Sequence, residues 1–248
     1  MEECISVFDM LKIGVGPSSS HTLGPWRAAE RFLLELRTEN ILQDVIRIKV
    51  DLYGSLSLTG KGHATDLAVM LGLSGQDPEY IPVQNIAGII KTIEDKNEII
   101  LANKLTIPFY FLQDITFNKN FLPFHANGLK FTAFLNDDSE YEATFYSIGG
   151  GFVVKEERVN AKKKHQIKCA FPYPIQNAEE LLNYTIDLNK SISEIVYENE
   201  KSMRTEEEIH TELMRIWNTM LECMYIGSHS EGILPGGLNV RRRAFDMH

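Results

Sequence analysis

Two loops built from glycine and serine, each followed at once by a helical pattern, constrain the fold of this chain more than any other feature. The first loop, residues 14–22, precedes a helix with Pro25 in its first turn, where a missing N–H costs nothing. The second loop, residues 54–66, follows alternating apolar and polar residues at 46–52, which predict a half-buried strand. Glycine-rich loops let the backbone approach a neighbour closely. The sequence therefore predicts a mixed α/β domain with both loops at helix N-termini.

The pattern that follows is one helix and then several strands. Apolar residues recur at helical spacing over 82–94. The turn at 136–139 is typical of a hairpin, and Gly149–Gly151 interrupts the last strand before 152–154. Three segments rich in aromatic and β-branched residues predict strands: 106–117, 129–135 and 141–146.

The character of the sequence changes at residues 160–166, which carry four bases and no large apolar side chain. Such a segment is typical of a solvated connection between domains. Beyond it, a helix is predicted over 178–188, and two capping boxes, Ser191–Glu194 and Thr205–Glu208, open two more. The last helix carries an apolar stripe that needs a partner surface, namely Ile209, Leu213, Trp217, Met220 and Met224.

These patterns predict an α+β fold in three parts. A mixed α/β domain covers 1–158, a linker covers 159–176, and an incomplete all-helical domain covers 177–248.

Composition and charge exclude several classes of function. The formal charge is −9, so the field of the protein repels nucleic acid and anionic lipid. No apolar stretch approaches the roughly 20 residues that span a bilayer, and Glu2 and Glu3 stand where a secretory signal carries bases. We therefore expect a cytoplasmic protein with no nucleic-acid or membrane partner. Three scattered cysteines without a CxxC pair predict neither a disulfide scaffold nor a self-contained metal site.

The second loop imitates a phosphate-binding loop without matching it. Five residues, not four, separate Gly54 from Gly60, and Gly62 replaces the Ser or Thr that would hold magnesium. Nucleotide binding is therefore rejected for this loop.

Both loops end in a histidine beside hydroxyl side chains. A neutral imidazole can accept a proton at physiological pH, and the N–H groups of a helix N-terminus suit a carboxylate. Taken alone, each loop is better explained as an N-cap, with Thr22 or Thr65 capping its helix and the histidine merely exposed. Finding the assembly twice favours a shared site formed by Ser18, Ser19, Ser20, His21 and Thr22 with His63, Thr65 and Asp66.

Three further features each keep two interpretations. Asn127 could bind a substrate carboxylate or amine, but Asn-Gly is also a common turn pair. Ser147, with the amides of Gly149–Gly151, could hold an anion, or the glycines make only a bulge. The run Arg241–Arg243 could meet an anionic ligand, although a short charge run is usually a solvated face.

Six segments spread over nearly the whole chain resemble the iron–sulfur L-serine dehydratases of bacteria, also called L-serine ammonia-lyases. They read SVFDMLKIGVGPSSSHTLGPWRAA, LYGSLSLTGKGHATD, LPFHANGLKF, YSIGGGF, SISEIVYENE and EGILPGGLNVRRRA. In that family a β domain, similar to the allosteric substrate-binding domain of some phosphoglycerate dehydrogenases, precedes a mostly helical α domain. The resemblance implies that residues 1–158 are the β domain and that 177–248 begin the α domain.

The resemblance also implies a reaction and a role for each candidate residue. L-serine loses water to give aminoacrylate, which becomes pyruvate and ammonia, without pyridoxal phosphate. A four-iron four-sulfur (4Fe-4S) cluster would act as Lewis acid on the leaving hydroxyl. His63 matches the histidine of the family's GHxTD loop and is the expected catalytic base. The remaining residues are expected to orient substrate (His21, Thr65, Asn127, Ser147), to line the pocket (Ser18, Ser19, Ser20), and to orient His63 or cap the helix (Asp66).

The cluster ligands are the main departure from the family pattern. The family's three cluster cysteines lie further along the α domain than His248, and Cys4, Cys169 and Cys223 match none of them, so no metal ligand is expected here. A truncated or frame-shifted reading, a boundary chosen for expression and a separate partner carrying the remainder each explain this. Truncation is favoured, because relatives with two subunits divide nearer the linker.

The expected partners are L-serine, a cluster-bearing α-domain remainder or subunit, and further copies of the chain in a homo-oligomer. The uncovered apolar stripe predicts self-association, and the chain alone is expected to be an inactive portion of a lyase. The alternative function is a non-catalytic serine-binding or regulatory module.

Overall fold

The computed structural model describes residues 4–16, 18–156, 171–234 and 239–247, and these belong to two compact units. The sheet unit comprises residues 13–158 and 232–242. The helical unit comprises residues 1–12, 159–231 and 243–248. The predicted domain boundary at 158 and the predicted linker as far as residue 170 lie outside the described residues.

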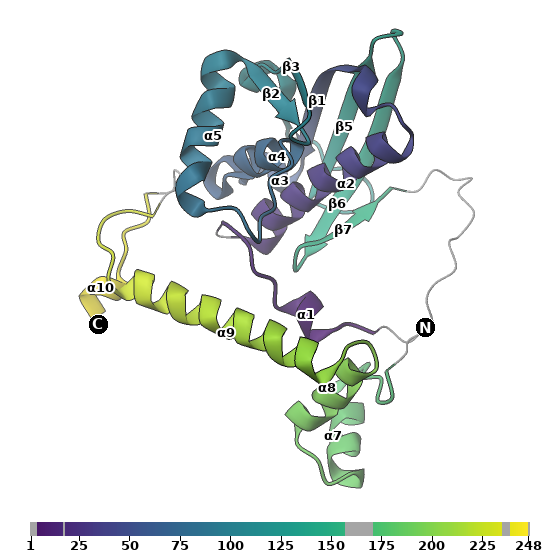
Figure 1. The fold of residues 1–248 in the computed structure, drawn as a ribbon, viewed down its shortest axis with the longest axis vertical. Coiled ribbons are helices and arrows are strands. Elements are labelled where there is room, and N and C mark those ends of the chain that lie inside the picture. The colour runs from purple at the N-terminus through teal and green to yellow at the C-terminus, as the bar shows by residue number, and fades with distance from the viewer. Residues whose placement is uncertain (1–3, 17, 157–170, 235–238, 248) are drawn as a thin grey trace. The chain divides into compact units, whose positions relative to one another are not determined.

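A five-stranded mixed sheet forms the framework of the sheet unit (Figure 1). Its strand order is β4-β1-β5-β6-β7; β1 and β4 are parallel, and the other neighbours are antiparallel. A separate two-stranded hairpin pairs β2 with β3. The strands are β1 (Val45–Tyr53), β2 (Glu98–Leu101), β3 (Leu105–Pro108), β4 (Ile115–Asn118), β5 (Gly128–Leu135), β6 (Glu140–Gly149) and β7 (Phe152–Lys155).

Helix α2 (Gly24–Thr38) packs against the sheet and against α4 (Thr65–Leu73), as Figure 1 shows. The helical spacing of Trp26, Ala29, Leu33 and Leu36 gives α2 an apolar face, which is buried. Phe32 stacks on Phe131 of β5 with ring centroids 4.9 Å apart. Helix α5 (Val83–Lys96) packs on α4 and confirms the helical spacing read there. The expected α+β class is confirmed, since strands and helices pack around one apolar core in this unit.

Two predicted strands differ from the structure for local reasons. The segment 106–117 is not one strand, because a short helix, α6 (Phe111–Asp114), separates β3 from β4. The buried Asp114 carboxylate accepts the N–H of Tyr110 and pairs with Arg47, which stabilises this break. In β1, the predicted alternation holds from Ile48 onward, but a register shift between Val45 and Arg47 buries Val45 and leaves Ile46 51% exposed.

The two glycine- and serine-rich loops fold into short helical turns. The first contains a π-helical turn, η1 (Ser19–Leu23), which leads into α2. The second contains α3 (Ser55–Leu58) and a 3₁₀ turn, η3 (Gly60–His63), which leads into α4. Both loops therefore lie at helix N-termini, as the sequence predicted.

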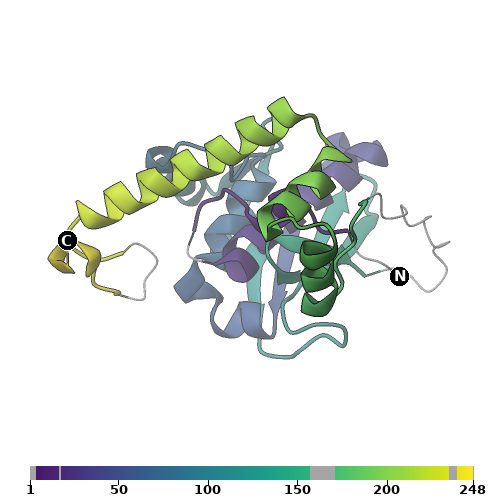
Figure 2. The same cartoon turned by 90° about the horizontal axis from the view of Figure 1, so that it is seen from below.

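The helical unit contains α1 (Val7–Met10), α7 (Ala178–Asp187), α8 (Ile192–Lys201), α9 (Glu206–Ser228) and α10 (Ala244–Met247). Both predicted capping boxes are present, at Ser191 and at Thr205. The long helix α9 runs through this unit (Figure 2) and buries Ile209. The rest of its stripe, from Leu213 to Met224, is 37–54% exposed. No described helix is long and apolar enough to cross a membrane.

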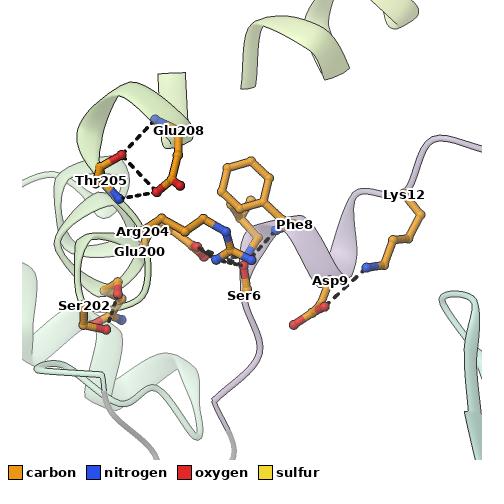
Figure 3. A network of polar contacts seen from close by, with 11 residues as sticks. Ser6, Phe8, Asp9, Lys12, Glu200, Ser202, Arg204, Thr205 and Glu208 are labelled. Carbon is orange, nitrogen blue, oxygen red and sulfur yellow. Dashed lines mark hydrogen bonds and ion pairs between the residues drawn. The ribbon is translucent and has the colours of Figure 1, made fainter. Parts of the chain in front are cut away.

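A buried carboxylate holds the N-terminal segment within the helical unit (Figure 3). Glu200 accepts hydrogen bonds from the N–H of Val7 at 2.7 Å, from Ser6 Oγ at 2.9 Å and from Arg204 at 2.8 Å. The guanidinium of Arg204 lies over the ring of Phe8, 4.8 Å from its centroid. Residues 6–8 are therefore fixed by a charge-assisted network to residues nearly 200 positions away.

Candidate active site

The two loops that each end in a histidine meet in the sheet unit. Turns η1 and η3 contact one another, and the imidazole rings of His21 and His63 lie with centroids 4.9 Å apart, tilted by 36°. The structure thus brings together the two histidines that the sequence selected 42 positions apart.

Two threonines join these loops reciprocally. Thr22 Oγ1 donates to the carbonyl of His63 at 2.9 Å, and Thr65 Oγ1 donates to the carbonyl of His21 at 2.6 Å. Both threonines are buried. Neither is a helix cap, because α2 and α4 begin without a side-chain cap, so the N-cap interpretation of Thr22 and Thr65 is wrong. The hydroxyls instead fix the distance between the backbones that carry the histidines.

The hydrogen bond of His63 defines its tautomer. Nδ1 of His63 lies 2.9 Å from the carbonyl oxygen of Thr59, one turn earlier. Because a carbonyl can only accept, Nδ1 carries the proton in the neutral ring. The lone pair of neutral His63 is therefore on Nε2, on the side of the ring away from this bond. The ring is partly exposed. A partly exposed imidazole with a free Nε2 lone pair can act as a general base.

Hydroxyl groups flank both nitrogens of His21. Nδ1 lies 2.9 Å from Ser20 Oγ, and Nε2 lies 2.9 Å from Ser55 Oγ. Burial lowers the pKa of His21 from its ordinary value, and the neighbouring His63 lowers this pKa further, whereas a hydrogen bond to the backbone of Ser55 raises it. Both effects favour the neutral form of the His21 ring, since an imidazolium is disfavoured by burial and by a neighbouring imidazole that can itself become charged.

Residues 18–20, here called the serine turn, are hydrogen-bonded to the sheet through their backbone. Ser18 Oγ accepts the N–H of His21 at 3.1 Å and lies 3.4 Å from Ser20 Oγ, whereas Ser19 is exposed. Ser147 Oγ, fully buried on β6, donates to the carbonyl of Ser20 at 2.7 Å. This approach requires Gly24, because a Cβ there would lie 1.9 Å from Ser147 Oγ.

Asn127 and Ser147 are paired through their main chains and an amide side chain. Asn127 Nδ2 donates to the carbonyl of Ser147 at 3.0 Å, and the N–H of Ser147 donates to the carbonyl of Asn127 at 3.0 Å. Both residues are buried. A register shift between Ser147 and Gly149 shows that the glycine run does form a bulge.

Asp66 lies at the start of α4 and is buried. Its carboxylate accepts the N–H of Leu67 at 3.0 Å, and burial raises its pKa. This bond occupies one N–H in the first turn of α4, and the bond that holds the His63 ring runs to the Thr59 carbonyl, so neither contact shows Asp66 orienting His63. Ala64, between His63 and Thr65, has a left-handed φ of 55°, which is strained for a non-glycine residue.

The described residues do not offer a ligand set for an iron–sulfur cluster. No group of three or more His, Cys, Asp or Glu in the described part of the chain is arranged to hold a metal ion. Cys4 is disulfide-bonded, which the scattered cysteine spacing did not predict, and Cys223 is an exposed free thiol. Cys169 lies outside the described residues. The described residues therefore do not supply the cysteine ligands of such a cluster, which the resemblance places beyond His248.

Two contacting residues were missed from the sequence. Ser55 and Thr59 hold the rings of His21 and His63, but a lone serine and threonine in a glycine-rich loop carry no distinguishing pattern. Of the arginine run, Arg241 is exposed and pairs with Ile233 in an isolated antiparallel bridge. This local pairing accords with the solvated-face interpretation.

The chain is similar to a known family and to several curated proteins. The family described as "Serine dehydratase beta chain" matches residues 6–158. L-serine dehydratase 1 of Escherichia coli (strain K12) is 41% identical over 241 residues, covering 97% of this chain and 53% of the relative. The L-serine dehydratases of Streptomyces coelicolor and Helicobacter pylori are 43% and 38% identical over 242 residues each.

The chain spans about half the length of the curated relatives it matches, since they are covered to 52–54%. The matched family region contains every residue of the two histidine loops, Asn127 and Ser147. By this match over residues 6–158, the chain belongs to the serine dehydratase beta chain family.

Proposed function

We propose that this chain is a portion of an L-serine dehydratase, a lyase that converts L-serine to pyruvate and ammonia. The single observation that carries the proposal is the histidine pair. Nδ1 of His63 is bonded to a carbonyl, which leaves the Nε2 lone pair to accept a proton, and the ring lies 4.9 Å from that of His21, whose pKa is lowered by burial. The names of relatives around 40% identical over nearly the whole chain supply the substrate.

The proposed role of His63 is to take the α-proton of L-serine at Nε2. Its Nδ1–H bond to the Thr59 carbonyl persists when the ring becomes an imidazolium, so the protonated form is also stabilised. The resulting carbanion loses its β-hydroxyl to give aminoacrylate, which is hydrolysed to pyruvate and ammonia. A placed base of this kind contributes about 10²- to 10⁴-fold in rate.

The remaining candidate residues are proposed to orient the substrate. Hydroxyls of Ser18, Ser19 and Ser20 and the amide of Asn127 are groups that hydrogen-bond a carboxylate or an ammonium. His21, whose ring nitrogens are held by Ser20 and Ser55, is proposed to orient the substrate through the position of its ring. Thr65 and Ser147 spend their hydroxyls on the carbonyls of His21 and Ser20. We therefore propose that these two position the serine turn rather than bind the substrate directly.

The 4Fe-4S cluster expected from the resemblance would have to be held by residues other than those described here, because these form no ligand set. Its chemistry when bound is that of a Lewis acid. We also propose that an α-domain remainder or subunit carries the cluster. A homo-oligomeric assembly and a cytoplasmic location are part of the same proposal.

The proposal is tested by turnover in a complete assembly. The chain is joined to the part of the E. coli relative beyond the match, reconstituted anaerobically with iron and sulfide, and assayed for pyruvate from L-serine. We expect His63→Ala to lower kcat by about 10²-fold or more. The control is His210→Ala, at an exposed histidine on α9, which should leave turnover unchanged.

The runner-up is a serine-binding regulatory module without chemistry, which the resemblance to an allosteric substrate-binding domain suggests. Saturable binding of L-serine with no pyruvate from the reconstituted assembly would favour this module and overturn the dehydratase proposal. Turnover that is the same in the His63→Ala variant would also contradict the assignment of the base.

A further inference from the structure

The loop at residues 54–66, which resembles a phosphate-binding motif, brings the end of β1 close to the loop that carries Asn127. Gly54 leaves β1 with φ 55° and ψ −124°, a combination open to glycine. A Cβ at this position would lie 2.4 Å from the carbonyl oxygen of Ala126 and 2.7 Å from the ring of Phe121. Glycine therefore allows the end of β1 to pass against the loop that carries Asn127.

This turn places Ser55 between three parts of the candidate site. Its N–H donates to the carbonyl of Ala126 at 2.9 Å, next to Asn127. Its carbonyl accepts the N–H and the hydroxyl of Thr59, whose own carbonyl holds His63. Its hydroxyl lies 2.9 Å from Nε2 of His21. Ser55 thus contacts Ala126 next to Asn127, Thr59, which holds the His63 ring, and His21 itself.

We propose that Ser55 is a positioning residue whose hydroxyl fixes the imidazole of His21 against that of His63. The inference rests on the proposed function of the histidine pair and names the residue that sets its geometry. Ser20 holds Nδ1 of His21 and Ser55 holds Nε2, so the hydrogen bonds at both nitrogens oppose rotation of the ring about the Cβ–Cγ bond. The ring of His21 in turn limits where the ring of His63 can lie.

The hydroxyl suits this role because it can donate or accept. In neutral His21 one nitrogen is a donor and the other an acceptor, and a serine hydroxyl satisfies either. Ser55 therefore holds the ring in both tautomers. An alanine at position 55 keeps the backbone bonds to Ala126 and Thr59 but leaves Nε2 without this partner, which separates the function of the hydroxyl from the fold of the turn.

The first experiment follows the histidine rings in the chain as it stands. Ring ¹H, ¹³C and ¹⁵N signals are assigned, and His21 is titrated in the wild-type chain, in Ser55→Ala and in Ser55→Thr. The control is Ser57→Ala, in the same short helix, and urea unfolding verifies that each variant is folded. We expect the ring signals and the midpoint of His21 to shift in Ser55→Ala and to return towards the wild-type values in Ser55→Thr.

The second experiment measures turnover in the reconstituted assembly used above. A small displacement of a catalytic group lowers the rate of the chemical step more than it weakens substrate binding. We therefore expect Ser55→Ala to reduce kcat by about 10-fold and to change KM by less than twofold. Ser55→Thr should recover most of the lost kcat, and Ser57→Ala should have no effect.

Unchanged His21 signals in a folded Ser55→Ala variant would overturn the positioning proposal whether or not the assembly is active. A shifted His21 with unchanged kcat would overturn the functional part of it. An assembly in which the wild-type chain makes no pyruvate overturns the proposed dehydratase function, while the ring signals still decide whether Ser55 positions His21.

Discussion

Replacing Thr65 with valine should destabilise the sheet unit by a predictable amount. The side chain is fully buried and its hydroxyl donates a 2.6 Å bond to the carbonyl of His21. Valine keeps the shape but removes this donor and leaves the carbonyl without it. Losing such a bond while leaving a partner unsatisfied costs about 1–3 kcal/mol, so we expect the free energy of unfolding to fall by about 2 kcal/mol.

The assay is urea unfolding followed by the fluorescence of Trp26, which is buried in the sheet unit. Trp217 is the other tryptophan and lies in the helical unit, so it is replaced by phenylalanine in every variant. The control is Thr92→Val, at an exposed threonine on α5 that donates to the Gly88 carbonyl one turn earlier. This control should change the free energy of unfolding by less than about 0.5 kcal/mol.

A double variant tests whether the hydrogen bonds of the two threonines are energetically coupled. Thr22→Val removes the reciprocal bond to the His63 carbonyl. Because both bonds join the same two turns, breaking the first frees the second, and we expect a coupling energy of at least about 0.5 kcal/mol. A loss below 0.5 kcal/mol for Thr65→Val, or strictly additive losses for the pair, would refute the reasoning that these hydroxyls hold the loops together.

Three other changes have expected outcomes. Gly24→Ala places a Cβ against a buried serine hydroxyl and should lower the free energy of unfolding by about 1–3 kcal/mol, measured by the same urea assay. Burial lowers the pKa of His21 below its unfolded value of 6.5, so the unfolded state takes up a proton on this ring more readily than the folded state as the pH falls. The stabilisation from the neutral ring is complete above pH 6.5 and is lost as the pH falls through the folded-state pKa. His21→Gln should flatten that part of the pH–stability curve. Glu200→Ala removes the acceptor of the Val7 N–H and should speed hydrogen exchange of that amide by at least about 10-fold. Glu198→Ala, at a partly exposed carboxylate, should leave this exchange rate unchanged. Equal exchange in both variants would contradict the conclusion that Glu200 fixes the N-terminal segment.

Much of the fold could be predicted because its signals are local. The apolar face of α2, the hairpin of β5 and β6, and both capping boxes of the helical unit depend on residues within a few positions of each other. The break in the segment 106–117 could not be predicted, because it depends on Asp114 pairing with Arg47, 67 positions away. The bond from Glu200 to Val7 spans 193 positions and has no local signal either.

The candidate site was predictable in its residues but not in its bonds. The repeated histidine-and-hydroxyl loops selected His21 and His63, and the structure places their rings together. The same pattern suggested threonine caps, yet the hydroxyls of Thr22 and Thr65 cross between the loops to opposite carbonyls. Which hydroxyl meets which carbonyl depends on how α2 and α4 pack, and sequence periodicity carries no information about that.

A base at His63 needs its neutral ring to carry the proton on Nδ1, and ¹⁵N spectra of histidine-labelled chain with neutral imidazole rings report this directly. We expect Nδ1 to appear as the protonated, pyrrole-type nitrogen and Nε2 as the unprotonated, pyridine-type nitrogen, because Nδ1 donates to the Thr59 carbonyl. A spectrum in which Nε2 of neutral His63 carries the proton would contradict its assignment as the base.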